Sequence, residues 1–152
     1  IIVDYDKFRL NFGEKENLGD NFLNISDSKF DGFERFFEKI DLCIIANSDI
    51  SCLTKAIDIV RKGGIILFFG EPKVNSKIKV DLSKIYSKEI KIITSYSATN
   101  LDFQESIKKI AEKQINLSNL ITHEFRFENS VKAIKLANDG KNRIKVVISK
   151  NN

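Results

Sequence analysis

Apolar and polar residues are arranged most regularly between residues 40 and 72. The apolar run over residues 42–46 is too short for a helix, and it predicts a strand buried on both faces. A helix is predicted next, because four apolar residues recur at helical spacing: Ile50, Leu53, Ile57 and Val60. We expect Gly63-Gly64 to end that helix, since glycine tolerates the left-handed conformation of a helix exit. A second apolar run over residues 65–69 completes a strand-helix-strand unit, which is typical of a parallel α/β sheet.

The alternation of strand and helix patterns continues on both sides of this unit. Strands are predicted at residues 1–4, 21–25, 90–94, 120–125 and 144–148. Helices are predicted at residues 7–18, 33–40, 101–115 and 129–139, and a polar loop is predicted at residues 26–32. Gly140 follows the last helix and is expected to cap it. The predicted fold class is therefore α/β, and sheets of this class bind ligands at the carboxyl ends of their strands.

The composition of the 152 residues is ordinary for a soluble globular protein, with 42% hydrophobic and 30% charged residues. No apolar run approaches the roughly 20 residues that a membrane span needs, so no membrane partner is expected. The net charge is +4, but the lysines are spread along the chain without the clustering that favours nucleic acid. The two cysteines, Cys43 and Cys52, indicate neither a disulfide framework nor a metal site, and we expect a reducing, cytoplasmic setting.

Asp4 ends the first predicted strand and is the most informative single residue. A carboxylate in this position can accept hydrogen bonds from both hydroxyls of a ribose, as in dinucleotide-binding folds that select NAD. The alternatives are that Asp4 caps the following helix or is a plain loop acid. Arg9 lies five residues further on, where its guanidinium either covers the adenosine or lies on the surface.

A dinucleotide site also needs a glycine-rich turn, G-x-G-x-x-G, to hold the pyrophosphate, and this sequence contains none. In the dinucleotide-binding fold that turn follows the first strand, which lies in the middle of the sheet order 3-2-1-4-5-6. Residue 1 is Ile1 and the chain has no methionine. We therefore expect a piece of a longer polypeptide with the first strand upstream; a rearranged sheet and two chains that complete each other are the alternatives.

No constellation for nucleophilic or acid-base catalysis is present in the sequence. His123 is the one histidine, so a Ser-His-Asp or Cys-His arrangement would have to use it. It alternates with apolar residues in a predicted strand, and we interpret it as a structural histidine. The sequence therefore predicts no catalytic residue and no metal ligand in this chain.

Several landmarks stand in a distinctive order along nearly the whole chain. They are Ile2-Val3-Asp4 with Arg9-Leu10, Leu18-Gly19-Asp20, residues 41–46 through 60–64, residues 69–72, residues 88–95, residues 120–123 and Phe127-Glu128. This ordered set resembles the nucleotide-binding and C-terminal portion of the medium-chain, zinc-dependent alcohol dehydrogenases, the family of sorbitol and threonine dehydrogenases. Two departures are visible, because the Leu18-Gly19-Asp20 turn lacks the family's alanine and Asn47-Ser48 replaces its Thr-Gly.

The resemblance implies a Rossmann-like, doubly wound parallel sheet that lacks its first strand and glycine-rich turn, followed by a C-terminal helix and strand segment. Residues 1–97 would form a partial NAD-binding domain, and residues 98–152 would complete it and pack on a catalytic domain outside this chain. The implied cofactor is NAD, with Asp4 and Arg9 at the adenosine. The other implied cofactor-binding residues are Ala46, Asn47 and Ser48 facing the cofactor, Phe69, Gly70, Ser95 and Tyr96 at the nicotinamide side, and Lys145 toward the pyrophosphate, with Arg143 as a neighbouring candidate.

The family's zinc ligands, proton relay and glycine-rich turn would all lie upstream of this chain. The resemblance therefore implies the cofactor-binding part of an NAD-dependent alcohol or polyol dehydrogenase, a homo-oligomer that acts on a small-molecule alcohol. We expect the 152 residues alone to be inactive. Two alternatives stay open, a non-catalytic remnant that binds a nucleotide or a partner, and a methyltransferase-like α/β domain.

Overall fold

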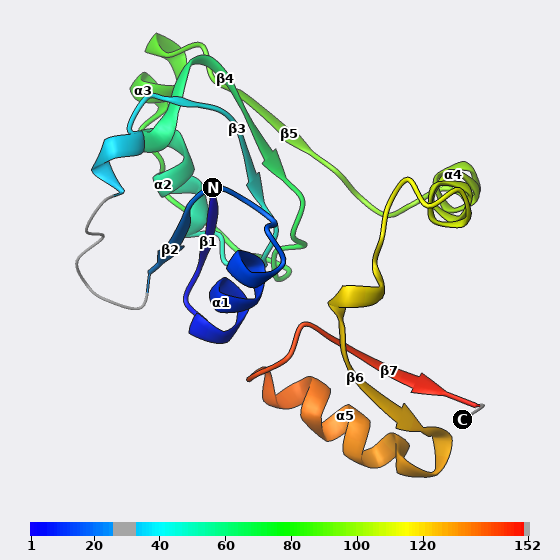
Figure 1. The fold of residues 1–152 in the computed structure, drawn as a ribbon. Helices are drawn as coiled ribbons and strands as arrows, with labels where there is room; N and C mark the ends of the chain where they lie inside the picture. Colours follow the sequence, from blue (N-terminus) through cyan, green and yellow to red (C-terminus); the bar gives the residue numbers. More distant parts are fainter. Residues whose placement is uncertain (26–32, 151–152) are drawn as a thin grey trace. The chain divides into compact units, whose positions relative to one another are not determined.

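The computed structural model describes residues 1–25 and 33–150, so the polar loop predicted at 26–32 lies outside the described residues. The chain forms two compact units, one from Ile1–Phe30 with Asn100–Asn152 and the other from Asp31–Thr99. Every strand pair in the described part of the chain is parallel (Figure 1), which confirms the α/β class.

The strands form separate sheets. In the first unit β1 (Ile2–Asp4) pairs with β2 (Phe22–Asn24), and β6 (Ile121–Arg126) pairs with β7 (Lys145–Ser149). The second unit holds a sheet in the order β3 (Ile40–Ile45), β4 (Val60–Phe68) and β5 (Lys91–Thr94). The orders β2-β1 and β3-β4-β5 match strands 3-2 and 4-5-6 of the dinucleotide-binding sheet. Among the described residues no strand takes the place of the central one, so β1 and β3 each lie at a sheet edge.

The core of the second unit lies between α2 (Cys52–Ile59) and the strands β3 and β4. Its buried side chains are Ile45, Ala56, Ile57, Ile59, Val60 and Ile66. The predicted end of the helix at Gly63-Gly64 is wrong, because Val60 is already extended and pairs with Ile40 as the first residue of β4. Gly63 does have a left-handed φ of 70°, but it lies inside β4, next to a shift in the register with β3.

The C-terminus of α2 is held by a lysine from outside the helix. The Nζ of Lys88 donates to the carbonyls of Ile57 at 3.1 Å and Asp58 at 3.3 Å, and it lies 3.2 Å from the carboxylate of Glu38. Lys88 directly follows α3 (Leu82–Ser87), a helix that Asp81 caps. A cation at the last carbonyls of a helix satisfies acceptors that have no partner within the helix.

The helix predicted at residues 33–40 is wrong except for one short turn, η1 (Glu34–Phe36). Glu38 has a left-handed φ of 56°, which is incompatible with a continuing helix, and Ile40 already belongs to β3. Phe33 is buried and its ring meets that of Phe37 edge to face, with ring centres 6.2 Å apart. Phe33 therefore packs in the interior, whereas Phe37 remains 43% exposed.

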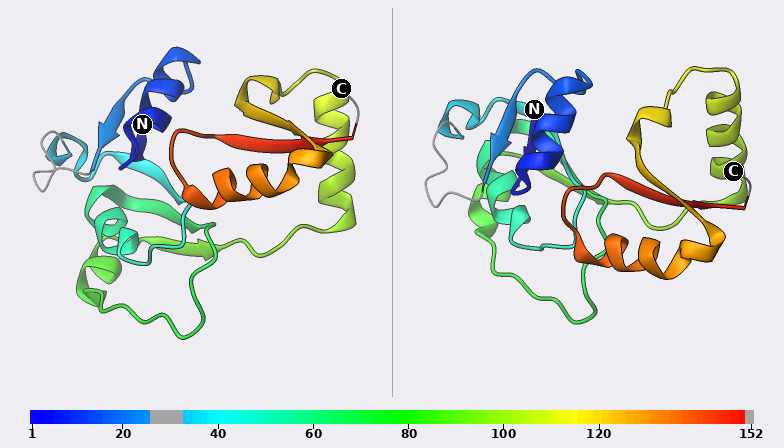
Figure 2. Two further views of the ribbon diagram at one scale, coloured as in Figure 1. Left: turned by 90° about the horizontal axis from the view of Figure 1, so that it is seen from below. Right: turned by 60° about the horizontal axis from the view of Figure 1, so that its bottom comes forward.

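The described residues of the first unit form the helices α1 (Lys7–Lys15), α4 (Asn100–Ala111) and α5 (Ser130–Asp139), with short turns η2 (Ser118–Leu120) and η3 (Phe127–Asn129). Both views in Figure 2 show α5 lying along the β6-β7 pair. Gly140 caps α5 with a φ of 75°, as predicted. The apolar stripe of α4 is present but exposed: Phe103, Ile107 and Ile110.

Gly13 lies inside α1, where glycine costs about 1 kcal/mol relative to alanine. A Cβ at this position would lie 2.7 Å from the ring of Phe22 in β2. The glycine therefore lets β2 approach the helix closely, a requirement of packing between two elements.

Candidate functional site

The predicted cofactor-binding residues of the second unit follow the carboxyl ends of β3, β4 and β5, at one end of the sheet. The amides of Phe69 and Gly70 both donate to the carbonyl of Ile45, at 3.1 Å and 2.8 Å. The amide of Ser95 donates to the carbonyl of Phe68 at 3.3 Å. Ala46, Asn47, Ser48, Phe69, Ser95 and Tyr96 are exposed, and Gly70 is half-buried.

Gly70 brings its backbone against the loop that follows β3. A Cβ on Gly70 would lie 2.0 Å from the carbonyl oxygen of Asn47 and 2.3 Å from its carbonyl carbon. These are backbone atoms, so no side-chain rotation could relieve the contact. Glycine is therefore required here by a close backbone approach rather than by its φ angle.

The side chain of Asn47 turns toward its own loop. Its Oδ1 accepts a hydrogen bond from the amide of Asp49 at 2.9 Å, and its Nδ2 lies 3.6 Å from the Sγ of Cys52. Asp49 in turn accepts from the amide of Ser51 at 2.9 Å, just before α2. Hydrogen bonds from Ser51 lower the pKa of Asp49. These local bonds give the loop between β3 and α2 a defined conformation at the strand ends.

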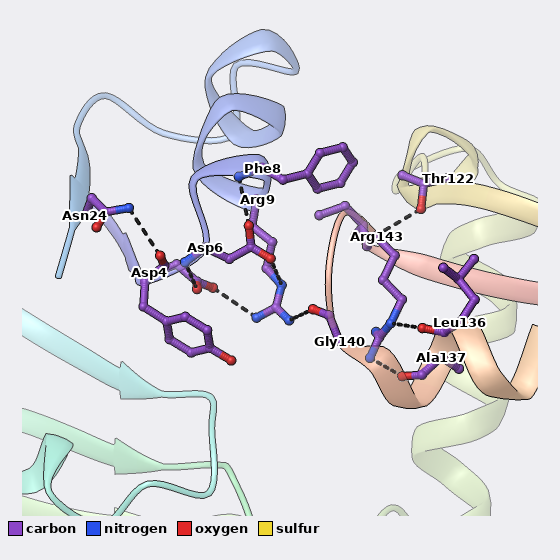
Figure 3. Close-up of polar contacts among 12 residues, drawn as sticks. Asp4, Asp6, Phe8, Arg9, Asn24, Thr122, Leu136, Ala137, Gly140 and Arg143 are labelled. Carbon is purple, nitrogen blue, oxygen red and sulfur yellow. Dashed lines mark hydrogen bonds and ion pairs between the residues drawn. The ribbon is translucent and has the colours of Figure 1, made fainter. Parts of the chain in front are cut away.

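Asp4 ends β1 in the first unit, with 22% of its side chain exposed. Its Oδ1 accepts from the amide of Asp6 at 2.9 Å, and its Oδ2 lies 3.3 Å from the Nη1 of Arg9 (Figure 3). The helix cap is Asp6, which accepts from the amide of Phe8 at 2.8 Å. Asp4 is therefore not the cap of α1, and its carboxylate keeps acceptor positions open toward solvent.

Arg9 joins parts of the first unit that are far apart in the sequence. Besides Asp4, it contacts Asp6 at 3.8 Å and donates from Nη2 to the carbonyl of Gly140 at 3.4 Å. Its guanidinium also lies 5.9 Å from the centre of the Tyr5 ring. Burial lowers the pKa of Arg9, but its neighbours Asp4, Tyr5 and Asp6 together raise the pKa above its ordinary value. The sequence interpretation of Arg9 did not include the Gly140 contact, because the two residues are 131 positions apart.

The two basic candidates near the end of the chain differ in what surrounds them. Arg143 donates from Nε to the carbonyl of Leu136 at 3.0 Å and also donates to the carbonyl of Ala137, so it closes the C-terminus of α5. Lys145, at the start of β7, is exposed, and its carbonyl accepts from the hydroxyl of Thr122 at 3.3 Å. Of the two, Lys145 has the cation that is available to a ligand.

Lys145 also lies on an apolar groove of about 890 Å³ within the first unit. The groove is formed by the end of α4, residues 115–121 and the β6-β7 pair. Sequence analysis did not find it, because its apolar residues come from elements without a shared periodicity. His123 lies in β6, where its Nδ1 is 3.1 Å from the hydroxyl of Thr122.

In the ranges 1–25 and 33–150, no group of three or more His, Cys, Asp or Glu side chains could hold a metal ion. Burial raises the pKa of the Cys43 thiol to about 11, with a smaller effect of Cys52, which disfavours the thiolate that metals bind. No helix of the described part of the chain is long and apolar enough to cross a membrane.

Comparison with known proteins finds curated relatives that match part of this chain. No family model matches the chain. Sorbitol dehydrogenase 1 of Saccharomyces cerevisiae is 27% identical over 82 residues, which are 54% of this chain and 22% of that protein. L-arabinitol 4-dehydrogenase of Aureobasidium melanogenum is 31% identical over 91 residues, 60% of this chain and 24% of that protein.

Solved structures match over nearly the whole chain. An alcohol dehydrogenase of Escherichia coli in complex with NADH superposes with a TM-score of 0.83 and 28% identity, over 97% of this chain and 43% of that one. A zinc-binding dehydrogenase of Clostridium scindens has the same fold, with a TM-score of 0.83 and 20% identity over 99% of this chain and 42% of that one. The chain thus spans less than half the length of each of these relatives.

Proposed function

This chain is related in sequence and fold to the zinc-dependent, medium-chain alcohol and polyol dehydrogenases, and from this premise we propose that it forms the cofactor-binding part of an NAD-dependent alcohol or polyol dehydrogenase. The observation that carries the proposal is the carboxylate of Asp4 at the carboxyl end of β1. It is half-buried, held in one orientation by two donors, and still open to further hydrogen bonds. Such a carboxylate suits the two hydroxyls of a ribose.

The residues present fit the adenosine half of NAD by their chemistry. Asp4 supplies the acceptor for the ribose, and Arg9 lies beside it with its guanidinium next to Tyr5. Lys145 supplies an exposed cation for the pyrophosphate. These roles stand on the donor and acceptor types of each side chain.

The nicotinamide side is assigned to the strand ends of the second unit. Here Ala46, Asn47, Ser48, Phe69, Gly70, Ser95 and Tyr96 would line the cofactor, largely through backbone groups. Bound NAD would supply the acceptor for a hydride from an alcohol carbon, and the residues of this chain would bind and orient the cofactor. The NADH complex of the Escherichia coli relative supports a nicotinamide cofactor for this chain.

The catalytic half of the reaction is assigned to residues outside this chain. Zinc ligands and a proton relay would come from another part of the polypeptide, so the 152 residues alone would bind the cofactor without transferring hydride. We further propose a small-molecule alcohol or polyol as substrate, a homo-oligomer as the working form, and the cytoplasm as its location. Hydride transfer by the isolated chain, followed by absorbance at the nicotinamide band, would contradict the assignment of catalysis.

The test of cofactor binding is an NADH titration of the intact protein, followed by fluorescence. Asp4→Asn keeps the size and one acceptor but removes the charge, and we expect it to weaken NADH binding about tenfold. Asp20→Asn is the matched control, because Asp20 is an exposed acid in the same unit. Equal affinities for both variants and the parent would mean that Asp4 does not bind the ribose.

The alternative of a non-catalytic, partner-binding module has one observation in its favour. Strands β1 and β3 each lie at a sheet edge, and open edges can pair with another chain. Dimerisation of the protein through these edges, with no affinity for NADH, would favour that alternative. The curated relatives named above are dehydrogenases, which favours the dehydrogenase hypothesis over a methyltransferase-like domain.

A further inference from the structure

The guanidinium of Arg9 makes polar contacts in opposite directions within the first unit. Its Nη1 lies 3.3 Å from Oδ2 of Asp4, and its Nη2 lies 3.4 Å from the carbonyl oxygen of Gly140. Figure 3 shows the guanidinium between the end of β1 and the turn that follows α5. One side chain therefore contacts both the candidate ribose carboxylate and a turn from the far end of the sequence.

The chemistry of the guanidinium makes this double contact directional. It is planar, stays charged, and presents donors on both Nη atoms, so contacts at both fix the plane of the group. The side chains of Arg9 and Asp4 are 31% and 22% exposed, so solvent screens their attraction only in part. The amide of Asp6 holds the other oxygen of Asp4 at 2.9 Å. The carboxylate is thus held from two sides.

The turn between α5 and β7 is likewise held at two places. From within, Arg143 donates to the carbonyls of Leu136 and Ala137 at the end of α5. From outside, Arg9 binds the carbonyl of Gly140, the left-handed residue that ends the helix. The same turn leads directly into Lys145, the exposed cation at the start of β7.

We propose that Arg9 is a positioning residue that couples the Asp4 carboxylate to the α5–β7 turn, so that ligand binding at Asp4 and ordering of the turn depend on each other. This inference rests on the proposed function for the identity of the ligand, NADH, and stands on the structure for the contacts. Coupling between two sites is reciprocal, so NADH bound at Asp4 stabilises the turn by the factor with which the turn strengthens NADH binding.

The test combines NADH titration with hydrogen-deuterium exchange of the peptide that covers residues 138–146, on the intact protein. In the parent, we expect NADH to slow exchange in this peptide. Arg9→Met removes both contacts; we expect about tenfold weaker NADH binding and loss of the NADH-dependent slowing. Arg9→Lys keeps the charge beside Asp4 but has no planar fork, so it recovers part of the affinity and none of the slowing. Lys7→Met is the control, an exposed lysine on the same helix that removes the same charge.

The outcomes separate the inference from the proposed function. If the parent does not bind NADH, the proposed function fails, and the contacts of Arg9 are then tested without ligand. In that case, faster exchange of the 138–146 peptide in the Arg9 variants than in Lys7→Met supports the positioning role. If the turn in both Arg9 variants exchanges and responds to NADH as in Lys7→Met, the inference is overturned, whatever the affinity. Should Arg9→Met fail to fold, Arg9→Lys decides by the same comparison.

Discussion

The substitution Gly70→Ala tests whether the end of β4 and the loop after β3 form one packed structure. The added methyl carbon would lie 2.0 Å from the carbonyl oxygen of Asn47, where ordinary van der Waals contact begins near 3.4 Å. Both groups belong to the backbone, so the two segments must move apart by more than a bond length or the hydrogen bonds that join them must break. The bonds at risk are those from the amides of Phe69 and Gly70 to the carbonyl of Ile45.

The expected cost follows from this geometry. Overpacking in a well-packed region destabilises by about 1–3 kcal/mol, and a backbone clash that no rotamer relieves falls at the upper end. With a urea dependence of about 1–3 kcal/mol per molar, the unfolding midpoint should fall by about 1 M or more. The NADH affinity should fall as well, because Asn47 and Ser48 lie on the displaced loop.

The matched control is Gly63→Ala within β4, the strand that precedes Gly70. Gly63 has a φ of 70°, and a Cβ there would meet only the Arg61 side chain, at 3.7 Å. The free energy of unfolding of this control should fall by about 1 kcal/mol, because alanine is strained in a left-handed backbone conformation. Its NADH affinity should equal that of the parent. Urea unfolding followed by circular dichroism measures the stabilities. If Gly70→Ala unfolds at the parent's midpoint, or loses no more stability than Gly63→Ala, the close approach at Asn47 is absent in solution and the reasoning is refuted.

Two further predictions concern the second unit. Lys88→Met should lower the free energy of unfolding by about 2–3 kcal/mol, because two part-buried carbonyls at the end of α2 lose a charged donor. As a control, Lys84→Met removes an exposed ion pair with Asp58 and should shift the urea midpoint far less. Equal shifts of the urea midpoint in the two variants would contradict the capping role of Lys88. Burial raises the pKa of Cys43 from 9.0 to about 11, so the thiol ionises in the unfolded chain at a lower pH than in the folded chain. The free energy of unfolding should therefore be highest below pH 9.0 and should fall as the pH rises from 9.0 to about 11. Cys43→Ser should remove that part of the decline and Cys52→Ser should retain it, and an unchanged pH profile in Cys43→Ser would show that the Cys43 thiol is not the group concerned.

Local patterns along the chain were sufficient for several features of the fold. The apolar runs at residues 42–46 and 65–69 give β3 and β4 of a parallel sheet, as predicted. The predicted burial of the first run on both faces is wrong, because Leu42 and Ile44 are 48% and 54% exposed. Gly140 ends α5 in the left-handed conformation that only glycine adopts without cost. The placement of Asp4 at the end of β1 also follows from local order, since it comes directly after the apolar residues of that strand.

Other features depend on neighbours that are distant in the sequence. The pattern assigned Val60 to a helix, but its pairing with Ile40 makes it the first residue of β4. The helical glycine Gly13 looks like a defect until the ring of Phe22 is placed against it.

The candidate site divides in the same way between sequence and tertiary structure. The types and order of its residues are properties of the sequence, and through the family resemblance they predicted a dinucleotide site. Only the tertiary structure shows which basic residue is available to a ligand: Arg143 is bonded to the end of α5, whereas Lys145 is exposed. The contact of Arg9 with Gly140 joins residues 131 positions apart. No local propensity encodes such a contact, because it forms only after the elements that carry the two residues have packed together.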